Sequence, residues 1–450
     1  MPPDLSNQDD LESVKPARVI GVREANIEAE SHPVRRVVKL LGPGLITGAS
    51  DDDPSGIGTY AVAGATLGFS TLWTALLTFP MMASVQFICS KIGLVTGMGL
   101  AGVLRRNYST SIVYPLIFAL VIANTINAGA DIGAIAAAVN LLVPKVPIVS
   151  LIVPIGLGIL ALQVWGSYRT IAKTFKWLSL ALLAYIGAAF FAHPPAAQVL
   201  HGTFVPHISF TTAYLTTLMA IFGTTISPYM FFWQTNQEVE EDVEMGRKAL
   251  WQRRGTTDSE LRYAAWDINI GMFFSNLVMY FIILTTAATL FKAGHHTIGS
   301  AADAAKALEP LAGRGSELLL AIGLIGAGIL AVPILTGSAG YALSEAFGWK
   351  FGLGQHPTRA PQFYTVIAAS MLIGMQMNFM GINPIAALYW TAVINGLLAP
   401  VLLFFIMLIS NNKKIMGNRI NGRGINLMGW ATTAVMFAAA VGLFATWGKS

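Results

Sequence analysis

Residues 42–56 read GPGLITGASDDDPSG and lie inside the first long apolar segment of the chain. Three consecutive aspartates followed by proline suit a continuous helix poorly, because proline lacks an amide hydrogen and clashes with the preceding turn. Asp53 directly precedes Pro54, and this position biases it away from helical geometry. We therefore predict a helix that breaks at Asp53, where free backbone carbonyls and a carboxylate can hold a cation.

The composition indicates an all-α integral membrane protein. Hydrophobic residues make up 54% of the 450-residue chain and charged residues only 11%, whereas a soluble domain carries roughly a quarter charged residues. The apolar residues form runs of about 20, the length that a helix needs to cross a bilayer. We predict about eleven transmembrane helices, at residues 42–68, 71–95, 111–142, 146–165, 173–192, 210–235, 267–290, 316–344, 362–379, 384–409 and 427–447.

A second break is expected in the sixth helix, where residues 224–229 read TTISPY. Pro54 and Pro228 then occupy matching positions in two five-helix sets, as in transporters built from inverted repeats. We predict a polar, disordered cytoplasmic tail at 1–39 and a ten-helix core at 40–409, with repeats at about 40–192 and 210–409. The segment 427–447 is predicted to be an additional transmembrane helix.

The distribution of Lys and Arg predicts the orientation. With the N-terminus in the cytoplasm, about 23 of the 28 Lys and Arg residues fall on the cytoplasmic side, as the positive-inside rule requires. The C-terminus is then outside. This asymmetry also explains the net charge of +5 without a nucleic-acid partner. We expect no enzymatic activity, because the chain carries no complete nucleotide-binding or catalytic motif.

The intramembrane acids are the candidate cation ligands, because an acid at the bilayer centre is costly and is usually functional. Asp53 is the first choice, Asp52 the second and Asp51 the third; carboxylates and carbonyls suit Mg2+, Ca2+ and Mn2+. Asp51 and Asp52 could instead cap a half-helix or face an aqueous vestibule. Asp131, in the third helix, could support the site, relay protons or serve only in packing.

Several motifs resemble the Nramp family of divalent-metal transporters: Gly42 to Ile46 followed by Asp53 to Gly56, Gly166 to Arg169, Ser227 to Tyr229, and Asn395 to Pro400 followed by Lys414 to Gly417. The resemblance covers residues 40 to 447. It implies the leucine-transporter fold of the APC superfamily, with a 5+5 inverted repeat and metal bound between broken helices 1 and 6. It further implies that the carbonyls of Asp53 and Thr224 are ligands and that Gly223 shapes the pocket.

The chain departs from the family at the motifs Asp-Pro-Gly-Asn and Met-Pro-His. Gly56 stands at the position of the Asn ligand, Ser227 at that of the Met thioether, and Tyr229 at that of the His. Loss of a soft thioether favours a hard ion, so the chain is most similar to the Nramp-related magnesium transporters. Asn127 and Ala130 stand where the family has acids of its proton route, which argues against proton coupling.

We therefore expect an alternating-access carrier that takes up Mg2+, and also Mn2+, without proton coupling. The metal is cargo, and no cofactor is expected. We expect the metal ion and the bilayer as partners, with no obligate protein partner. The compact layout predicts a plasma membrane location, in the bacterial inner membrane. The alternatives are a proton-coupled Mn2+ or Fe2+ symporter of ordinary Nramp type and an amino-acid carrier on the same fold. A receptor is disfavoured because the longest loop, about 236–266, is too short for a further domain.

Overall fold

A computed structural model describes residues 42–166 and 180–446. The expected tail at 1–39 and most of the motif from Gly166 to Arg169 lie outside these residues. All regular structure in the described ranges is helical. Within the described ranges, eight helical segments are long and apolar enough to cross a membrane, and the two halves of the sixth expected span count as one of them.

Both predicted breaks are confirmed. The first span divides into α3 (Pro43–Asp51) and α4 (Pro54–Leu67), and the sixth into α12 (Thr212–Thr225) and α13 (Pro228–Glu244). Pro54 and Pro228 are each the first residue of a half-helix, the position where a missing amide hydrogen costs nothing. Asp53 and Ser227, which precede them, have extended backbone angles, as expected for residues before proline.

The other expected spans are helical as well. The fifth is described only from Leu180, as a 3-10 turn that leads into α10 (Ala184–Phe191). The remaining spans are α5 (Trp73–Thr96), α7 (Thr110–Leu142), α8 (Ile148–Trp165), α15 (Asp258–Thr286), α18 (Ser316–Phe347), α19 (Pro361–Gln376), α20 (Pro384–Asn411) and α22 (Arg423–Thr446).

The prediction of a loop at 236–266 is wrong. The second half-helix continues to Glu244, α14 spans Leu250–Arg253, and α15 already begins at Asp258. Hydropathy marks only the apolar part of a helix, whereas polar turns are added where caps and ion pairs stabilise them. Here Thr257 and Glu260 form a capping box, and the Arg247 guanidinium lies 2.8 Å from Asp242 and 2.7 Å from Glu260.

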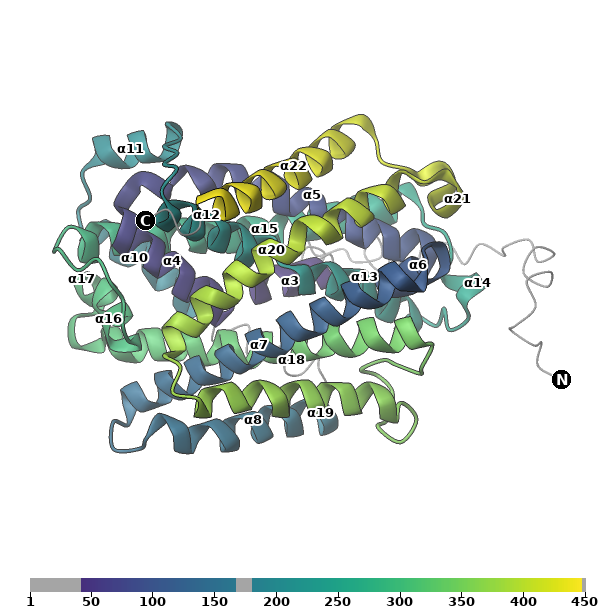
Figure 1. Cartoon of the computed structure of the whole chain (residues 1–450), viewed down its shortest axis with the longest axis horizontal. Coiled ribbons are helices and arrows are strands. Elements are labelled where there is room, and N and C mark those ends of the chain that lie inside the picture. The colour runs from purple at the N-terminus through teal and green to yellow at the C-terminus, as the bar shows by residue number, and fades with distance from the viewer. Residues whose placement is uncertain (1–41, 167–179, 447–450) are drawn as a thin grey trace, which may run out of the picture.

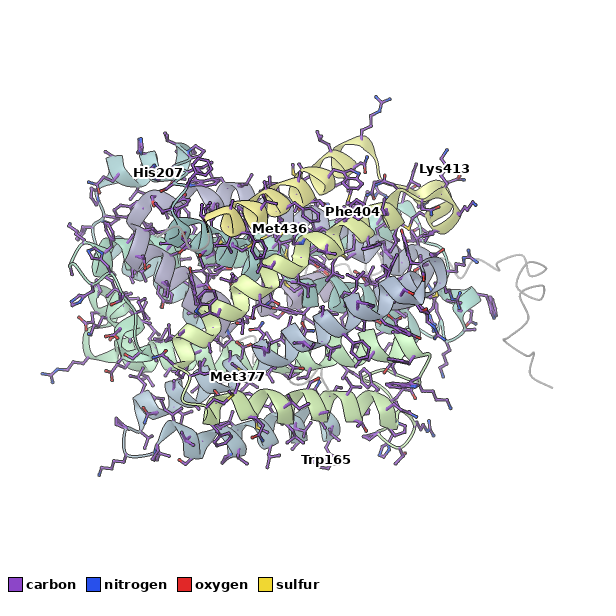
Figure 2. The ribbon with its side chains drawn as sticks, in the orientation of Figure 1. Trp165, His207, Met377, Phe404, Lys413 and Met436 are labelled. Carbon is purple, nitrogen blue, oxygen red and sulfur yellow. The ribbon has the colours of Figure 1, made fainter. Side chains whose placement is uncertain are left out.

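The helices lie roughly along the long axis of the molecule (Figure 1). The half-helices α3 and α4 lie within the bundle, where α3 packs on α13, α15 and α18. Close packing of α3 on α15 depends on glycine, since a Cβ atom on Gly48 would lie 2.4 Å from the carbonyl carbon of Gly271. The short helices α6 (Leu100–Asn107), α14 and α21 (Lys413–Met416) gather at one end of the bundle. Figure 2 shows Lys413 at this end and His207 at the other.

Candidate cation-binding site

The first break is organised by Asp53. Its carboxylate caps α4, because Oδ1 accepts hydrogen bonds from the Gly56 amide at 2.7 Å and the Ser55 hydroxyl at 2.6 Å. Oδ2 accepts a longer hydrogen bond, of 3.4 Å, from the side-chain amide of Asn127 on α7. Cap and amide together fix the carboxylate in a buried position, where Oδ2 retains lone pairs for a further ligand.

Asp51 and Asp52 face a different helix. The hydroxyl of Ser275 on α15 lies in hydrogen-bonding contact with Oδ2 of Asp51 and 3.3 Å from Oδ1 of Asp52. One hydroxyl hydrogen cannot satisfy both acids, and Oδ1 of Asp51 is buried without a hydrogen-bond partner. Asp51 is fully buried and bonds to Ser275, so neither alternative considered from the sequence, a half-helix cap or an open vestibule, describes it.

The second break places Thr224 and Gly56 against each other. A Cβ atom on Gly56 would lie 3.1 Å from Oγ1 of Thr224, 3.2 Å from the carbonyl oxygen of Asp51 and 3.3 Å from the Tyr60 ring. The hydroxyl of Thr224 is buried and interacts with the hydroxyl of Tyr60. The two broken helices therefore meet at Gly56 and Thr224, and in this arrangement neighbouring atoms already surround the space beside Gly56.

Ser227 and Gly223 have structural partners. The Ser227 hydroxyl points back along α12, 2.6 Å from the Gly223 carbonyl and 2.9 Å from the Thr224 carbonyl. Gly223 permits close packing on α20, since a Cβ atom there would lie 1.9 Å from the Ala392 carbonyl oxygen. The expected carbonyl ligands thus already accept hydrogen bonds: Thr224 from Ser227, and Asp53 from the Ile57 amide at 3.0 Å. A cation would have to share these oxygens, each of which has two lone pairs.

Tyr229 and Asp131 lie near the two breaks. The Tyr229 hydroxyl donates a hydrogen bond of 3.0 Å to the Ser50 carbonyl, which joins α13 to α3. Asp131 on α7 is fully buried, forms no ion pair in the described ranges, and is approached by the backbone amide of Ser55 and by the carboxylate of Asp53. An acid in this environment requires a proton or a nearby cation.

Among the described residues, the site gathers four buried acidic side chains without a basic partner. Asp51, Asp52, Asp53 and Asp131 are exposed by 0%, 6%, 1% and 0%, and none forms an ion pair with Lys or Arg in the described ranges. Within residues 42–166 and 180–446, no three Asp, Glu, His or Cys side chains converge as a ready chelate. The arrangement therefore attracts a cation and would complete its coordination with hydroxyls, carbonyls and retained water.

Asp267, a buried acid of α15, was not among the predicted site residues. Its carboxylate caps α3, with Oδ2 2.7 Å from the Gly44 amide and Oδ1 2.9 Å and 3.1 Å from the amides of Gly42 and Leu45. Ser275 lies further along the same helix and was also missed. The position of Asp267 within an apolar span could have marked it as a residue with a role. Its partners could not be predicted, because they lie more than 200 residues away in the sequence.

Comparison with known proteins identifies the family. The family pattern described as natural resistance-associated macrophage protein-like (Nramp) matches residues 44–446, which include both breaks. The chain belongs to the Nramp family. Its members are transporters, so the prediction that this chain is not an enzyme is confirmed.

Relatives and solved structures agree with this assignment. The "Divalent metal cation transporter MntH" of Bacillus subtilis (strain 168) is 28% identical over 421 residues, which cover 90% of this chain and 92% of the relative. The manganese transporter of Eremococcus coleocola superimposes with a TM-score of 0.70 at 20% identity, over 93% of this chain and 88% of that one. Mhp1, a nucleobase-cation-symport-1 family transporter, superimposes with a TM-score of 0.54 at 14% identity, over 90% of each chain. These structural likenesses confirm the predicted leucine-transporter fold.

Proposed function

We propose that this Nramp chain carries hard divalent cations, Mg2+ and also Mn2+, into the cell by alternating access and without proton coupling. The observation that carries the proposal is the set of buried, unpaired carboxylates at the first break. Curated relatives are described as divalent metal cation transporters, which supports the broader class of cargo. In this proposal Asp53 is the principal ligand and Thr224 contributes its hydroxyl and carbonyl oxygens.

The choice of a hard ion rests on the donor atoms. Asp53, Thr224 and Ser227 offer oxygen, and the position that resembles a family thioether is Ser227. Oxygen donors suit Mg2+ and Mn2+, whereas thioethers favour softer transition metals. Mg2+ also dehydrates reluctantly and keeps several waters.

A hydrated ion needs more space than this closed arrangement provides. Gly56 and Thr224 face each other across the breaks, and Tyr229 holds α13 on α3. We propose that α4 and α12 separate to admit the ion from outside, and that α3 and α13 separate to release it inside. A membrane potential that is negative inside contributes about 2.3 kcal/mol per charge per 100 mV, so a divalent ion gains roughly twice that.

The remaining assignments follow from this function. We propose a core at 40–409 that is divided near residue 200, with Gly223, Asn127, Asp131, Pro54 and Pro228 shaping or supporting the site. Asp51 and Asp52 would contribute charge from the α15 side of the break. The additional helix at 427–447, the cytoplasmic N-terminus and a bacterial inner membrane location are part of the same proposal.

Uptake into proteoliposomes tests the proposal. We would load vesicles with a Mg2+-sensitive dye and a pH-sensitive dye and compare the natural chain with Asp53→Asn. Glu317→Gln, which alters an exposed acid away from the breaks, is the matched control. The expected result is Mg2+ entry without acidification, lost in Asp53→Asn and retained in Glu317→Gln.

Two other results would overturn it. Entry of Mn2+ but not Mg2+, with acidification of the vesicle lumen, would indicate a proton-coupled symporter of ordinary Nramp type. If neither Mg2+ nor Mn2+ were taken up and an amino acid were, the result would favour an amino-acid carrier on this fold.

A further inference from the structure

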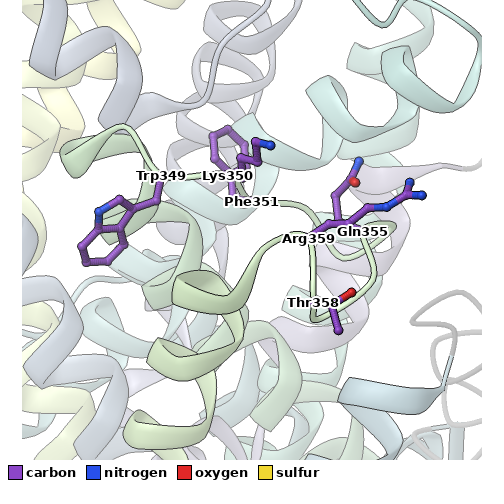
Figure 3. Close-up of a pocket in the computed structure, with 6 residues that line it drawn as sticks. All are labelled: Trp349, Lys350, Phe351, Gln355, Thr358 and Arg359. Atoms are coloured by element: carbon purple, nitrogen blue, oxygen red, sulfur yellow. The ribbon is translucent and has the colours of Figure 1, made fainter.

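The loop between α18 and α19 forms a cavity that lies apart from the two breaks. Its volume is about 590 Å3, within the range of small-molecule sites. Figure 3 shows Lys350 and Phe351 on one side of it and Gln355 and Arg359 on the other. The lining residues are Trp349, Lys350, Phe351, Gln355, Thr358 and Arg359.

The walls of this cavity are braced by buried side chains. The Tyr341 hydroxyl accepts a hydrogen bond of 3.3 Å from the Leu353 amide, and the Tyr364 hydroxyl donates one of 2.9 Å to the Gln355 carbonyl. The Arg359 amide closes a turn on the His356 carbonyl at 2.8 Å. A braced loop loses less conformational entropy when a ligand binds, so this is a preorganised site.

Among the described residues, the lining of the cavity carries two positive charges, those of Lys350 and Arg359, and no acidic side chain. In the described part of the chain neither Lys350 nor Arg359 forms an ion pair. The carboxylate of Glu240 lies behind the lining, beside Gly352, and its Oε1 accepts a hydrogen bond of 3.1 Å from the Tyr341 hydroxyl. Two cations, one hydroxyl and one amide on a single lining are donors suited to an anion with several oxygens.

The position of the cavity indicates a membrane surface. The α18–α19 loop lies at the same end of the bundle as α6, α14 and α21, where Lys and Arg predict the cytoplasmic side (Figure 1). Trp349 stacks on Phe347 with ring centroids 5.0 Å apart, at the end of α18. Aromatic residues next to cations at a helix end are typical of the headgroup region, and basic pockets there bind anionic headgroups.

We propose that this cavity binds a phosphate group, with Arg359 as the two-pronged donor, Lys350 as the second cation and Thr358 as a hydroxyl donor. An anionic phospholipid would present its phosphate from the adjoining bilayer, with Trp349 against the glycerol region. A soluble phosphate compound would enter from the aqueous side. The chemistry is shared, and the experiment below separates the two sources.

The test measures the thermal unfolding temperature of the full chain in neutral detergent, because a ligand that binds only the folded state raises this temperature. The probes are short-chain phosphatidylglycerol, phosphatidylcholine of the same chain length and inorganic phosphate. The variant is Lys350→Gln combined with Arg359→Gln. Lys413→Gln combined with Lys414→Gln is the charge-matched control, in exposed positions at the same end of the molecule (Figure 2).

We expect phosphatidylglycerol to stabilise the natural chain and the control, with at least a tenfold weaker apparent affinity in the Lys350 and Arg359 variant. Phosphatidylcholine should have no effect. Stabilisation by inorganic phosphate as large as that by phosphatidylglycerol would identify a soluble ligand as the source, and stabilisation by phosphatidylglycerol alone would identify the lipid. An unchanged response in the variant, or no response of the natural chain to either phosphate probe, would overturn the proposal. The readout is binding, so it stands apart from metal transport.

Discussion

The Tyr229 hydroxyl donates a hydrogen bond of 3.0 Å to the carbonyl oxygen of Ser50, so a side chain at the start of α13 holds the last turn of α3. The two residues are 179 positions apart in the sequence. Their bond links the two broken helices on one side of the cation site. Motion of α3 away from α13 must break it.

Tyr229→Phe should therefore favour the conformation in which α3 and α13 separate. Loss of the bond leaves the buried Ser50 carbonyl without this donor, and we expect a cost of about 1 kcal/mol to the closed state. The measurement is thiol labelling of Ala49→Cys, because Ala49 lies on α3 against the cluster that contains Tyr229 and has no side-chain hydrogen bond to lose, and the native Cys89 is fully buried and gives little background. Labelling should be several-fold faster with Tyr229→Phe. Equal rates in both backgrounds would show that the bond does not control the separation.

Asp267→Asn should destabilise the protein through the start of α3. The Asp267 carboxylate accepts hydrogen bonds from the Gly42, Gly44 and Leu45 amides, and charged acceptors at a helix N-terminus also benefit from the helix dipole. We expect a loss of about 1.5 to 3 kcal/mol, seen as a lower thermal unfolding temperature in detergent. Asp258→Asn removes an exposed ion pair with Arg419 and should cost under about 1 kcal/mol. Similar losses for both variants would contradict this account.

Ser227→Met should shift selectivity from Mg2+ toward the softer Cd2+. The substitution supplies a soft thioether at the second break and removes the hydroxyl that bonds to the Gly223 and Thr224 carbonyls. We expect the ratio of Cd2+ to Mg2+ uptake to rise several-fold in proteoliposomes that report both metals. Ser227→Ala, which removes the hydroxyl without adding sulfur, separates the two effects. An equal shift in both variants would rule out the thioether as the cause.

Gly48→Ala should disrupt the packing of α3 on α15. The added methyl group would lie 2.4 Å from the Gly271 backbone, too close for either helix to stay in place. We expect this overpacking to lower the free energy of unfolding by about 1 to 3 kcal/mol. Gly158→Ala in α8 is the control, because its Cβ atom would meet nothing within 4 Å and alanine favours a helix. Transport and the thermal unfolding temperature should fall in Gly48→Ala and not in Gly158→Ala. If Gly48→Ala left both unchanged, the two helices would be able to move apart without a loss of stability.

The sequence by itself determined the features that depend on neighbours along the chain. Apolar runs of bilayer length marked the helices, and Pro54 and Pro228 marked where α4 and α13 begin, because proline constrains its own residue and the one before it. Asp53 was the expected centre of the first break, and it is the residue that caps α4. The order of these motifs was sufficient to indicate the family.

Only the tertiary structure decided which polar groups meet across helices. Ser275 with Asp51, Asp267 with the start of α3, and Thr224 with Gly56 join residues that are between 168 and 225 positions apart. Local propensity carries no information on such pairs, because hydropathy and backbone rules describe a helix and not the neighbour on which it packs. The polar ends of α13 and α15 were missed for the same reason, since the Arg247 ion pairs that hold them form only after the helices pack.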